Sequence, residues 1–394
     1  MFKTSVVVYT SGMENDLIIS RLTCDFNKTI KDPLWKDIHV SAGFWRLFLT
    51  PQMQKLDRLR QLGPTALVYP GAVHTRLGHS LGVYHVAKWI VLSLLSNGYG
   101  PFSLKGVYSF LAAAMMHDLG HFPYAHSLKE VITEDHEALG ARIIGSSEEI
   151  LRSLEEIGAD PDWVMAIIDK SLRADNDEVR MYRNMLSGTL DPDKLDYLCR
   201  DAFYCGVPYG VQDVSYLIGQ IQLTDTGLGL NQINMSSVEH VLFSKYLMYK
   251  NVYWNKRVRC ATAMIKRAVC DALEGGYIRQ TDLFDLDDSQ FIELCRSRQI
   301  PLLRLVRRVR DNSLLEQIDE FSWEPGFDSS SMERELGQKL GRMVIVDVPE
   351  PISFESDLRI VDLRAPFIDC DPVFNRSSIK GFSTSLRKVR VFAE

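Results

Sequence analysis

Several features that mark other classes of protein are missing from these 394 residues. No run of about 18 apolar residues occurs, so no membrane-spanning helix is predicted. The first residues include a short apolar stretch but lack the apolar core and cleavage site of a signal peptide, which makes a cytoplasmic location the expectation. The seven cysteines form no CxxC pair, and their spacings match neither a zinc knuckle nor a redox motif. Free thiols are therefore expected.

Excess positive charge is also absent, since the formal net charge is -6. That balance gives no broad electrostatic attraction to nucleic acid or anionic lipid, although it leaves room for a local basic pocket. Apolar residues make up 46% of the chain and charged residues 24%, which is typical of a globular protein. The chain contains no internal repeat or low-complexity segment, and its length suits one large domain or two ordinary ones.

Apolar residues recur at helical spacing from about residue 42 to 275. Two segments carry clear helix signals. VYHVAKWIVLSLLSNG ends in glycine, and SLKGVYSFLAAAMMHDLGH has Ser103 as a candidate N-cap and Gly120 as a stop. Further helices are predicted at 136–144, 147–157, 161–170, 192–205, 213–220 and 236–274.

The pattern of apolar residues changes after residue 275. Short helices are predicted at 287–297, 301–309, 313–320 and 331–340. They alternate with strand-like runs such as RMVIVDVPE and KVRVFAE. We therefore predict a mainly α protein with three parts: residues 1–40, irregular or weakly stranded; a helical core of residues 41–275; and a smaller α+β region of residues 276–394.

Histidine is concentrated in one part of the chain. Seven of the nine histidines lie between His74 and His136, about a sixth of the length. Imidazole and carboxylate are common ligands of catalytic divalent cations. His79 stands near the start of one helix, and His117 and Asp118 end the next. Because consecutive helix residues point about 100° apart, this pair can bind one ion only where the helix ends and the backbone turns, here at Gly120.

A third element supplies another acidic group. In LDPDKLDYLCRD, Asp191 is a good N-cap and Pro192 suits the first helical position. Asp193 then falls in the first turn, with Tyr197 and Asp201 on the same face at i+4 and i+8. Each element alone is common by chance, and His79 alone could be a packed core histidine. The conjunction of HTRLGHS, HDLGHFPYAH and this segment indicates a metal site.

At these residues the chain resembles the HD-domain phosphohydrolase superfamily. Within it the chain is similar to the deoxynucleoside triphosphate triphosphohydrolases, which include bacterial enzymes and a vertebrate protein that joins a sterile-alpha-motif to an HD domain. The resemblance runs from about Asp32 to about Lys256, and TPQMQKLDRLRQLGPTALVYPGAVHTRLGHSLG is especially close in pattern. It implies a helical HD-domain core, hydrolysis of deoxynucleoside triphosphates (dGTP among them) to deoxynucleoside and inorganic triphosphate, and assembly as a homo-oligomer.

The resemblance also implies how this site is used. One divalent metal ion, whether Mn, Fe, Mg, Zn, Co or Ni, would be held by His79, His117, Asp118 and Asp193. The family pattern places the ligand directly before a lysine, which favours Asp193 over Asp196; Asp196 is instead expected to pair with Arg200 at i+4. The side chains expected on the triphosphate are Arg76, Lys194, Lys245 and Tyr253. Those expected around the deoxyribose are Gln61, Leu62, Tyr197 and Asp201.

These substrate contacts have simpler explanations as well. A basic residue taken alone is often a solvated surface charge, and Gln61-Leu62 could be an ordinary helix end before Gly63. A triphosphate, however, brings several negative charges that clustered cations would offset.

Protonation of the leaving 5′-oxygen requires a general acid, and an imidazole of near-neutral pKa suits that step. His126 is the first candidate, with His121 and His136 in support and Glu137 beside them. Three residues past the acid histidine, the vertebrate pattern has an Asp. This chain has Lys129 followed by Glu130, so either Glu130 or Glu137 substitutes or the proton relay differs.

The chain departs from the vertebrate pattern in its activation site too. There an Asp and an Arg flank a Gln and bind a guanine nucleotide. This chain keeps Gln54 but has Leu49 and Asp57 at the flanking positions, so an activator bound in that manner is not expected. In a later helix, Asn255 stands where the family pattern has His.

The stretch RSRQIPLLRLVRRVR carries six arginines between residues 296 and 310. An amphipathic helix with a solvated basic face is the favoured interpretation. The alternative is a site for a nucleotide effector, nucleic acid or an acidic partner.

Three functions therefore compete. The first is hydrolysis of deoxynucleoside triphosphates. The second is an HD phosphohydrolase for another nucleotide, either a monophosphate or a cyclic nucleotide. The third is a catalytically weak sensor that binds nucleotide or nucleic acid and keeps the metal as a structural clamp.

Overall fold

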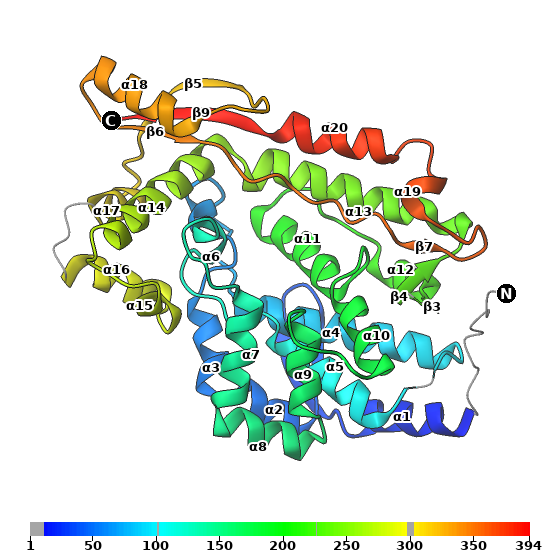
Figure 1. Cartoon of the computed structure of the whole chain (residues 1–394). Helices are drawn as coiled ribbons and strands as arrows, with labels where there is room; N and C mark the ends of the chain where they lie inside the picture. Colours follow the sequence, from blue (N-terminus) through cyan, green and yellow to red (C-terminus); the bar gives the residue numbers. More distant parts are fainter. Residues whose placement is uncertain (1–11, 101, 226, 298–302) are drawn as a thin grey trace.

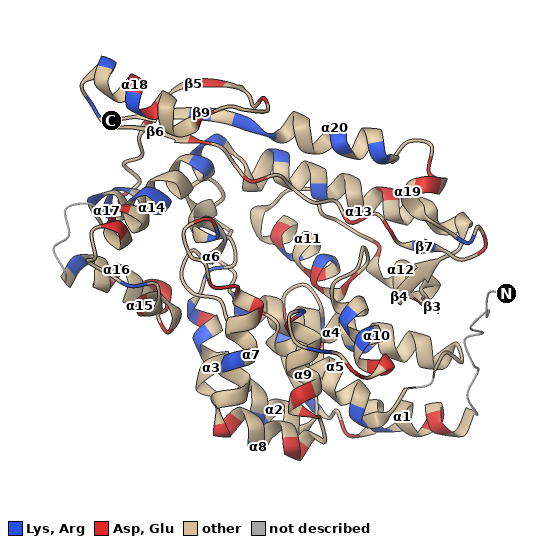
Figure 2. Cartoon of the chain, in the orientation of Figure 1, with Lys and Arg blue, Asp and Glu red and all other residues tan. Residues whose placement is uncertain are grey.

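The computed structural model describes residues 12–100, 102–225, 227–297 and 303–394, and within them it leaves out the side chain of His126. Helices dominate these ranges, and short strands gather mainly in the C-terminal part, so the expected mainly α fold class is confirmed (Figure 1). Helices α11 (Pro192–Cys205) and α14 (Lys256–Glu274) carry charged residues of both signs, whereas long parts of α4 (Arg76–Ser96) and α5 (Leu104–Met116) carry none (Figure 2). In the part of the chain so described, no helix is both long and apolar enough to cross a membrane.

The N-terminal segment contains more helix than the sequence suggested. Helix α1 (Gly12–Cys24) precedes a hairpin of β1 (Lys28–Asp32) and β2 (Lys36–Val40). The expectation of an irregular or weakly stranded segment is therefore wrong for α1. Ile18 and Leu22, one turn apart, are buried in the main core, and this contact with distant helices stabilises α1. Residues 1–11 lie outside the described ranges.

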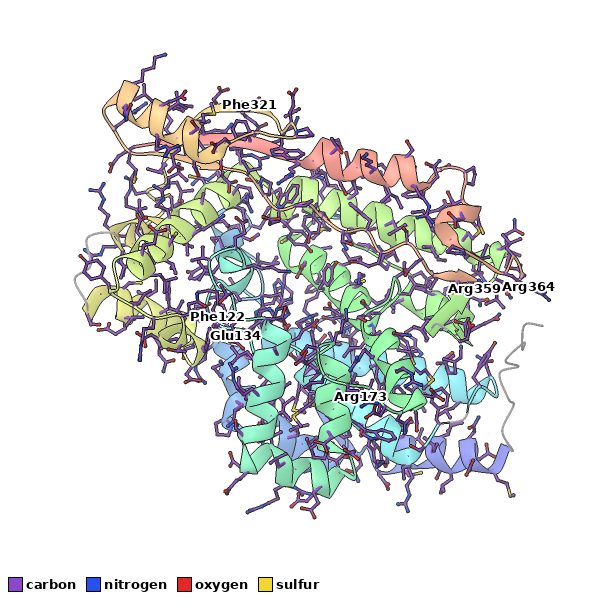
Figure 3. All side chains as sticks on the ribbon, viewed as in Figure 1. Phe122, Glu134, Arg173, Phe321, Arg359 and Arg364 are labelled. Atoms are coloured by element: carbon purple, nitrogen blue, oxygen red, sulfur yellow. The ribbon has the colours of Figure 1, made fainter. Side chains whose placement is uncertain are left out.

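The helical core is built from elements of very different length. Its helices up to residue 220 bury most of their apolar residues in one continuous core, with α2, α8 and α9 at the bottom of Figure 1. They are α2 (Ala42–Phe48), α3 (Pro51–Lys55), α4 (Arg76–Ser96), α5 (Leu104–Met116), α6 (Ala125–Leu128), α7 (His136–Ser146), α8 (Glu148–Ile157), α9 (Pro161–Ile168), α10 (Asp177–Leu186), α11 (Pro192–Cys205) and α12 (Val214–Gln220). Short 3-10 turns lie at Leu56–Arg58, Gly63–Leu67 and Gln232–Asn234. Side chains fill the spaces between the ribbons (Figure 3).

Two predictions within this core need correction. Helix α10 was not anticipated, although its buried residues Val179, Tyr182 and Met185 recur at helical spacing and Asn176 caps its start. The single helix expected over 236–274 is instead three segments: α13 (Met235–Met248), a π-helical turn at Tyr249–Tyr253, and α14 (Lys256–Glu274). Asn255 ends the π turn because its side chain accepts the backbone N–H of Arg257 and so starts a new helix.

The turn after α5 forms for a different reason from the one expected. Ser103 caps α5 as predicted, since its hydroxyl accepts the Gly106 N–H at 2.9 Å. Gly120, however, does not have a positive φ. A Cβ there would overlap the backbone of α7 at His136 and Gly140. Glycine is therefore required by the close approach of two backbones, which brings the end of α5 against the start of α7.

The C-terminal part adds two small sheets and several short helices. The helices are α15 (Thr281–Phe284), α16 (Asp288–Ser297), α17 (Arg304–Arg310), α18 (Ser329–Leu340), α19 (Phe367–Cys370) and α20 (Arg376–Leu386). One sheet has the order β5-β9-β6 and is antiparallel, with β5 (Glu316–Ser322), β6 (Val344–Asp347) and β9 (Lys388–Ala393). The other has the order β3-β4-β7-β8, with β3 (Gln222–Thr224), β4 (Gly227–Leu230), β7 (Arg359–Ile360) and β8 (Ala365–Pro366).

The helix expected at 313–320 is wrong, because this segment is strand β5. Its backbone pairs with β9, whose buried Val389 and Val391 supply an apolar partner that local sequence does not reveal. The division at residue 275 stays a prediction. The parallel pair β4–β7 joins segments on either side of it, and Leu358 and Ile360 belong to the same core as the early helices.

The arginine-rich stretch forms an amphipathic helix over its described part. Leu305, Val306 and Val309 of α17 are buried. Its basic face is largely ion-paired, because Arg304 and Arg308 both bind Glu394. The structure therefore supports the helical interpretation; residues 298–302 of this stretch lie outside the described ranges.

Candidate metal centre and adjoining cavity

His79 lies in the first turn of α4 and faces α11. The side chain of Thr75 caps this helix end by accepting the Gly78 N–H. The two ring nitrogens of His79 have different neighbours: Nε2 lies 3.0 Å from Asp193 Oδ1, and Nδ1 lies 2.8 Å from Asp196 Oδ2. One nitrogen is thus fixed by a carboxylate behind it, while the other faces the cavity beside a second carboxylate.

Asp196 is held within the protein. It accepts hydrogen bonds from Trp35 Nε1 at 2.5 Å and from Arg200 Nε at 2.8 Å, so the expected pair with Arg200 is present. Arg200 also contacts Asp32 at 2.8 Å. Burial would raise the pKa of Asp196, but Arg200 and His79 outweigh burial and lower it. Both oxygens of Asp196 are engaged, so this carboxylate orients His79 and is not free to bind an ion.

His117 and Asp118 follow directly after the last residue of α5. His117 Nδ1 lies 3.0 Å from the Ala114 carbonyl, which leaves Nε2 as the free lone pair. Nε2 is buried and has no hydrogen-bond partner among the described residues, yet Asp118 Oδ1 lies 3.4 Å from it and Asp193 Oδ1 3.8 Å. Asp118 is further held by Arg76 Nη1 at 2.7 Å.

These side chains fit a divalent cation. Ligand atoms of His79, His117 and Asp118 all lie within 4.8 Å of one another, and Asp193 Oδ1 lies beside both imidazoles. A buried imidazole nitrogen without a partner is costly unless something binds it. Burial opposes protonation of His79, but its hydrogen bonds to Asp193 and Asp196 outweigh burial and raise the pKa to about 10. The site therefore attracts positive charge, and two imidazoles with two carboxylates suit several divalent metals.

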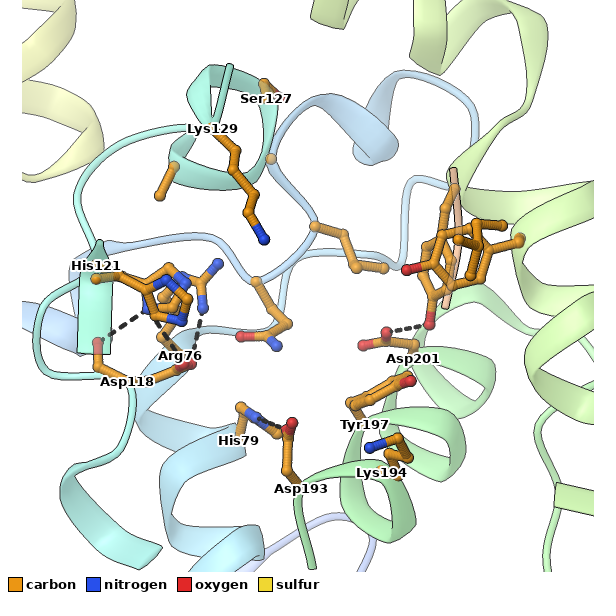
Figure 4. A pocket seen from close by; sticks show the side chains of 18 of the residues that line it. Arg76, His79, Asp118, His121, Ser127, Lys129, Asp193, Lys194, Tyr197 and Asp201 are labelled. Atoms are coloured by element: carbon orange, nitrogen blue, oxygen red, sulfur yellow. Dashed lines mark hydrogen bonds and ion pairs between the residues drawn. The ribbon is translucent and has the colours of Figure 1, made fainter. Parts of the chain in front are cut away.

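A cavity of about 650 Å³ opens beside this group. Figure 4 shows His79 of α4 facing Asp193 at the start of α11, with Lys194, Tyr197 and Asp201 further along α11. All the residues expected to contact metal or substrate line this cavity: Gln61, Leu62, Arg76, His79, His117, Asp118, Asp193, Lys194, Tyr197, Asp201, Lys245 and Tyr253. The structure thus brings together side chains separated by almost 200 residues.

The expected phosphate-binding cations already have protein partners. Lys194 Nζ lies 2.6 Å from Asp191 Oδ2 and 3.6 Å from Glu355 Oε2. Lys245 Nζ donates to Glu355 Oε2 at 2.9 Å and to the Ser353 carbonyl at 2.7 Å. Burial lowers the pKa of Lys245, and Glu355 partly restores it.

The expected sugar-binding carboxylate is also held in place. Asp201 Oδ2 accepts the Tyr253 hydroxyl at 2.6 Å, and Asp201 Oδ1 lies 2.8 Å from His74 Nε2. The π turn at Tyr249–Tyr253 directs Tyr253 at this carboxylate. Gln61 Oε1 is buried and has no partner among the described side chains, so it remains available to a ligand.

The expected proton-donating residues lie at the other side of Asp118. His121 Nδ1 lies 3.1 Å from Asp118 Oδ1, and the His121 and His136 rings are 4.3 Å apart. Burial lowers the pKa of His136 and raises the pKa of Glu137, both at the start of α7. The side chain of His126, the first candidate, lies outside the described part of the structure.

The residues that replace the family's orienting Asp point in different directions. Lys129 extends into the cavity (Figure 4). Glu130 forms an ion pair with Lys266 of α14. Glu130 and Glu137 were the two candidates to replace the family's Asp. Glu130 is thus held by its ion pair with α14, whereas Glu137 lies next to His136 in the chain.

Sequence reasoning missed two residues of this site. His74 belongs to the histidine cluster, but no role was assigned to it; its spacing before His79 was the available signal. Glu355 lies more than 100 residues beyond Lys245, in a segment without a motif. Only the folded chain places it in the cavity.

The chain matches two family descriptions: "HD domain" over residues 76–182 and "HD associated region" over residues 212–365. Uncharacterized protein YwfO of Bacillus subtilis is 34% identical over 242 residues, which cover 61% of this chain and 54% of that protein. Uncharacterized protein MJ1154 of Methanocaldococcus jannaschii is 28% identical over 296 residues, or 74% of this chain and 57% of that protein. The chain thus spans little more than half the length of these two relatives.

A third relative has a descriptive name. The deoxynucleoside triphosphate triphosphohydrolase SAMHD1 homolog of Dictyostelium discoideum is 24% identical over 373 residues, which cover 88% of this chain and 70% of that protein. The crystal structure of a phosphohydrolase from Bacteroides thetaiotaomicron superposes with a TM-score of 0.74 at 22% identity, over 93% of this chain and 99% of that one. This structural likeness shows the fold. The HD-domain and HD-associated matches, the named relatives and the shared fold confirm the expected resemblance: the chain carries an HD domain followed by an HD-associated region, and it resembles the HD-domain phosphohydrolases, deoxynucleoside triphosphate triphosphohydrolases among them.

Proposed function

We propose that this protein hydrolyses deoxynucleoside triphosphates to deoxynucleoside and inorganic triphosphate with one divalent metal ion. The observation that carries the proposal is a single cavity that combines the candidate ligands His79, His117, Asp118 and Asp193 with Lys194 and Lys245. Its volume of about 650 Å³ is within the usual range for a small-molecule site. A divalent cation bound there would supply Lewis acidity for hydrolysis of the phosphate ester.

The remaining residues bind and orient the substrate in this proposal. Lys194 and Lys245 offset the charge of the triphosphate, and Arg76 supports the site through Asp118. Asp201, aligned by His74 and Tyr253, accepts the 3′-hydroxyl of the sugar. Leu62 and Tyr197 pack beside the sugar, where apolar surface disfavours a 2′-hydroxyl, and Gln61 offers the buried amide oxygen.

The proton for the leaving 5′-oxygen comes from an imidazole on the side of the cavity opposite Asp201. His126 remains the first candidate, and His121 is the best placed of the described histidines because Asp118 holds its Nδ1. The His136 ring lies against that of His121 at an interplanar angle of 53°, and His136 holds a proton less readily because burial lowers its pKa. Glu137 adds a carboxylate beside His136.

One observation favours the alternative of a less highly charged nucleotide. Glu355 already offsets the charge of Lys245 and contacts Lys194, so the free positive charge in the cavity is smaller than its lysines suggest. A monophosphate or cyclic nucleotide carries fewer negative charges than a triphosphate, so fewer free cations would be needed to bind it.

Product analysis separates these functions. The purified protein is loaded with Mn²⁺ and incubated with each deoxynucleoside triphosphate, each ribonucleotide, nucleoside monophosphates and cyclic nucleotides, and the products are resolved by ion-exchange chromatography. Release of inorganic triphosphate from deoxynucleotides alone supports the proposal. Release of orthophosphate or of a nucleoside monophosphate supports the second function. Binding of nucleotide or nucleic acid without turnover supports the sensor. Light scattering on the same sample tests the expected homo-oligomer.

A further inference from the structure

An acidic side chain of the C-terminal part enters the cavity at Lys194 and Lys245. Glu355 Oε2 lies 2.9 Å from Lys245 Nζ and 3.6 Å from Lys194 Nζ. Burial would raise the pKa of Glu355, but the two lysines outweigh burial and lower it to about 2. A full negative charge therefore lies between the two cations at neutral pH.

The backbone that carries Glu355 is anchored outside the cavity. We call residues 349–355 the acidic strap. The Pro349 carbonyl accepts from Arg387 Nε at 2.8 Å, and the Ile352 carbonyl accepts from Ser383 Oγ at 2.9 Å. Phe354 is buried, and its ring lies 6.2 Å from that of Phe382 on α20. The strap is thus fixed to the C-terminal part, while the Glu355 side chain stays 31% exposed and can rotate away without moving the strap.

The other partners of the lysines are part of the scaffold. Asp191 is the N-cap of α11, where its Oδ1 accepts the Lys194 N–H at 2.7 Å, so it cannot leave without exposing a helix end. The Ser353 carbonyl, which accepts from Lys245, and the Gly188 carbonyl, which accepts from Lys194 at 3.0 Å, are backbone groups. Glu355 is therefore the one partner of Lys194 and Lys245 within the described residues that a side-chain rotation removes.

We infer that Glu355 is an affinity-determining residue that competes with the substrate's phosphate chain for Lys194 and Lys245. The inference rests on the proposed function, since it takes a polyphosphate to be the ligand of these lysines. An anion that reaches them must first displace the carboxylate, so its apparent affinity falls by the fraction of molecules in which Glu355 is bound.

The same competition acts on the product. Inorganic triphosphate carries more charge than the nucleoside and would otherwise be held by both lysines and the metal centre. Return of the Glu355 carboxylate replaces the lost ion pair as triphosphate leaves, so the exchange releases product without leaving the buried Lys245 ammonium without a charged partner.

The test compares Glu355→Gln with Glu350→Gln. Glu350 is an exposed residue of the same strap that also lines the cavity but has no ion pair among the described residues, so its variant removes the same charge from the cavity without removing a contact to either lysine. The probe is inorganic triphosphate, titrated calorimetrically against each Mn²⁺-loaded protein. The Kd of triphosphate is expected to fall by roughly tenfold in Glu355→Gln, because no carboxylate then competes for the lysines. In Glu350→Gln the Kd should change far less, because only a distant, screened charge is removed.

An unchanged or higher Kd in Glu355→Gln overturns the inference, because Glu355 would then hold the lysines for the ligand instead of competing with it. If Glu355→Gln fails to fold, Glu355→Asp serves the same purpose: its shorter side chain withdraws the carboxylate from Lys245, and the Kd should again fall below that of the unaltered protein. The titration needs no turnover. Tighter triphosphate binding without hydrolysis of any deoxynucleotide would reject the proposed function alone, and hydrolysis with an unchanged Kd would reject the inference alone.

Discussion

Replacing Gly82 with alanine is expected to weaken metal binding although Gly82 is not a ligand. Gly82 lies on α4, three residues after His79, where α4 packs against α11. An added Cβ would overlap the Asp196 carboxylate and come 2.5 Å from Arg200 Nη2. These two groups are buried and fixed by each other, so neither can move without losing a charged partner. Asp196 would withdraw from His79 Nδ1, and the imidazole would lose the contact that orients its Nε2.

The magnitude follows from two opposing effects. Glycine to alanine inside a helix normally stabilises it by about 0.5–1 kcal/mol. Overpacking of a filled site costs about 1–3 kcal/mol, so we expect a net loss of stability. Loss of the carboxylate behind a metal-binding histidine typically costs about 10–100-fold in metal affinity, or roughly 1.4–2.7 kcal/mol.

Gly78 provides the matched control on the same helix. A Cβ there has its nearest neighbour 3.7 Å away, at Arg200 Nη1, which is ordinary van der Waals distance. Gly78→Ala should therefore keep metal affinity and raise the melting temperature slightly. Calorimetric titration of Mn²⁺ into both variants and thermal melts give the readouts. Equal Mn²⁺ affinity in the Gly82→Ala variant and the unaltered protein would refute the argument that Asp196 orients His79.

Three further outcomes are expected. Asp193→Ala should abolish both Mn²⁺ binding and hydrolysis; retained activity would mean that Asp193 is not a ligand. Burial, with Lys88 nearby, lowers the pKa of His85 from 6.5 to about 4, so its contribution to stability is present above pH 6.5 and is lost as the pH falls toward 4. His85→Phe should therefore reduce the loss of stability between pH 7 and pH 4.5 by about 1–3 kcal/mol in urea titrations, and an identical loss in both proteins would argue against it. Arg308→Ala should cost about 1 kcal/mol because it removes contacts to Glu394 and the Ser313 carbonyl, whereas Arg307→Ala should be nearly neutral and neither should alter oligonucleotide binding; a loss of such binding would revive the nucleic-acid hypothesis.

Local signals in the sequence were enough to predict much of the helical core. The Ser103 cap and the start of α11 at Pro192 depend on hydrogen bonds within a few residues, and both lie where the sequence placed them. The clustering of His79, His117 and Asp118 could also be anticipated, because histidine enrichment is visible without a structure. Their assignment as metal ligands stays a prediction that the geometry makes chemically reasonable.

Features that depend on distant partners could not be predicted in the same way. Strand β5 has a sequence that is ambiguous by itself, and only pairing with β9 near the end of the chain makes it a strand. Helix α1 is stabilised by burial of Ile18 and Leu22 against helices that follow much later. Glu355 reaches Lys245 across 110 residues, a contact for which no spacing rule exists.

The parallel pairing of β4 with β7 has a consequence for how the protein is made. Gly229 is paired with Arg359, so about a third of the chain must leave the ribosome between synthesis of the first strand and arrival of its partner. Domains generally fold from the N-terminus during translation, and contacts so distant in sequence form slowly. The helices that carry His79 and His117 can thus pack together early, while the edge of β4 that pairs with β7 is still exposed. A nascent chain passes through a stage in which the histidine cluster is assembled and the wall bearing Glu355 has yet to be synthesised.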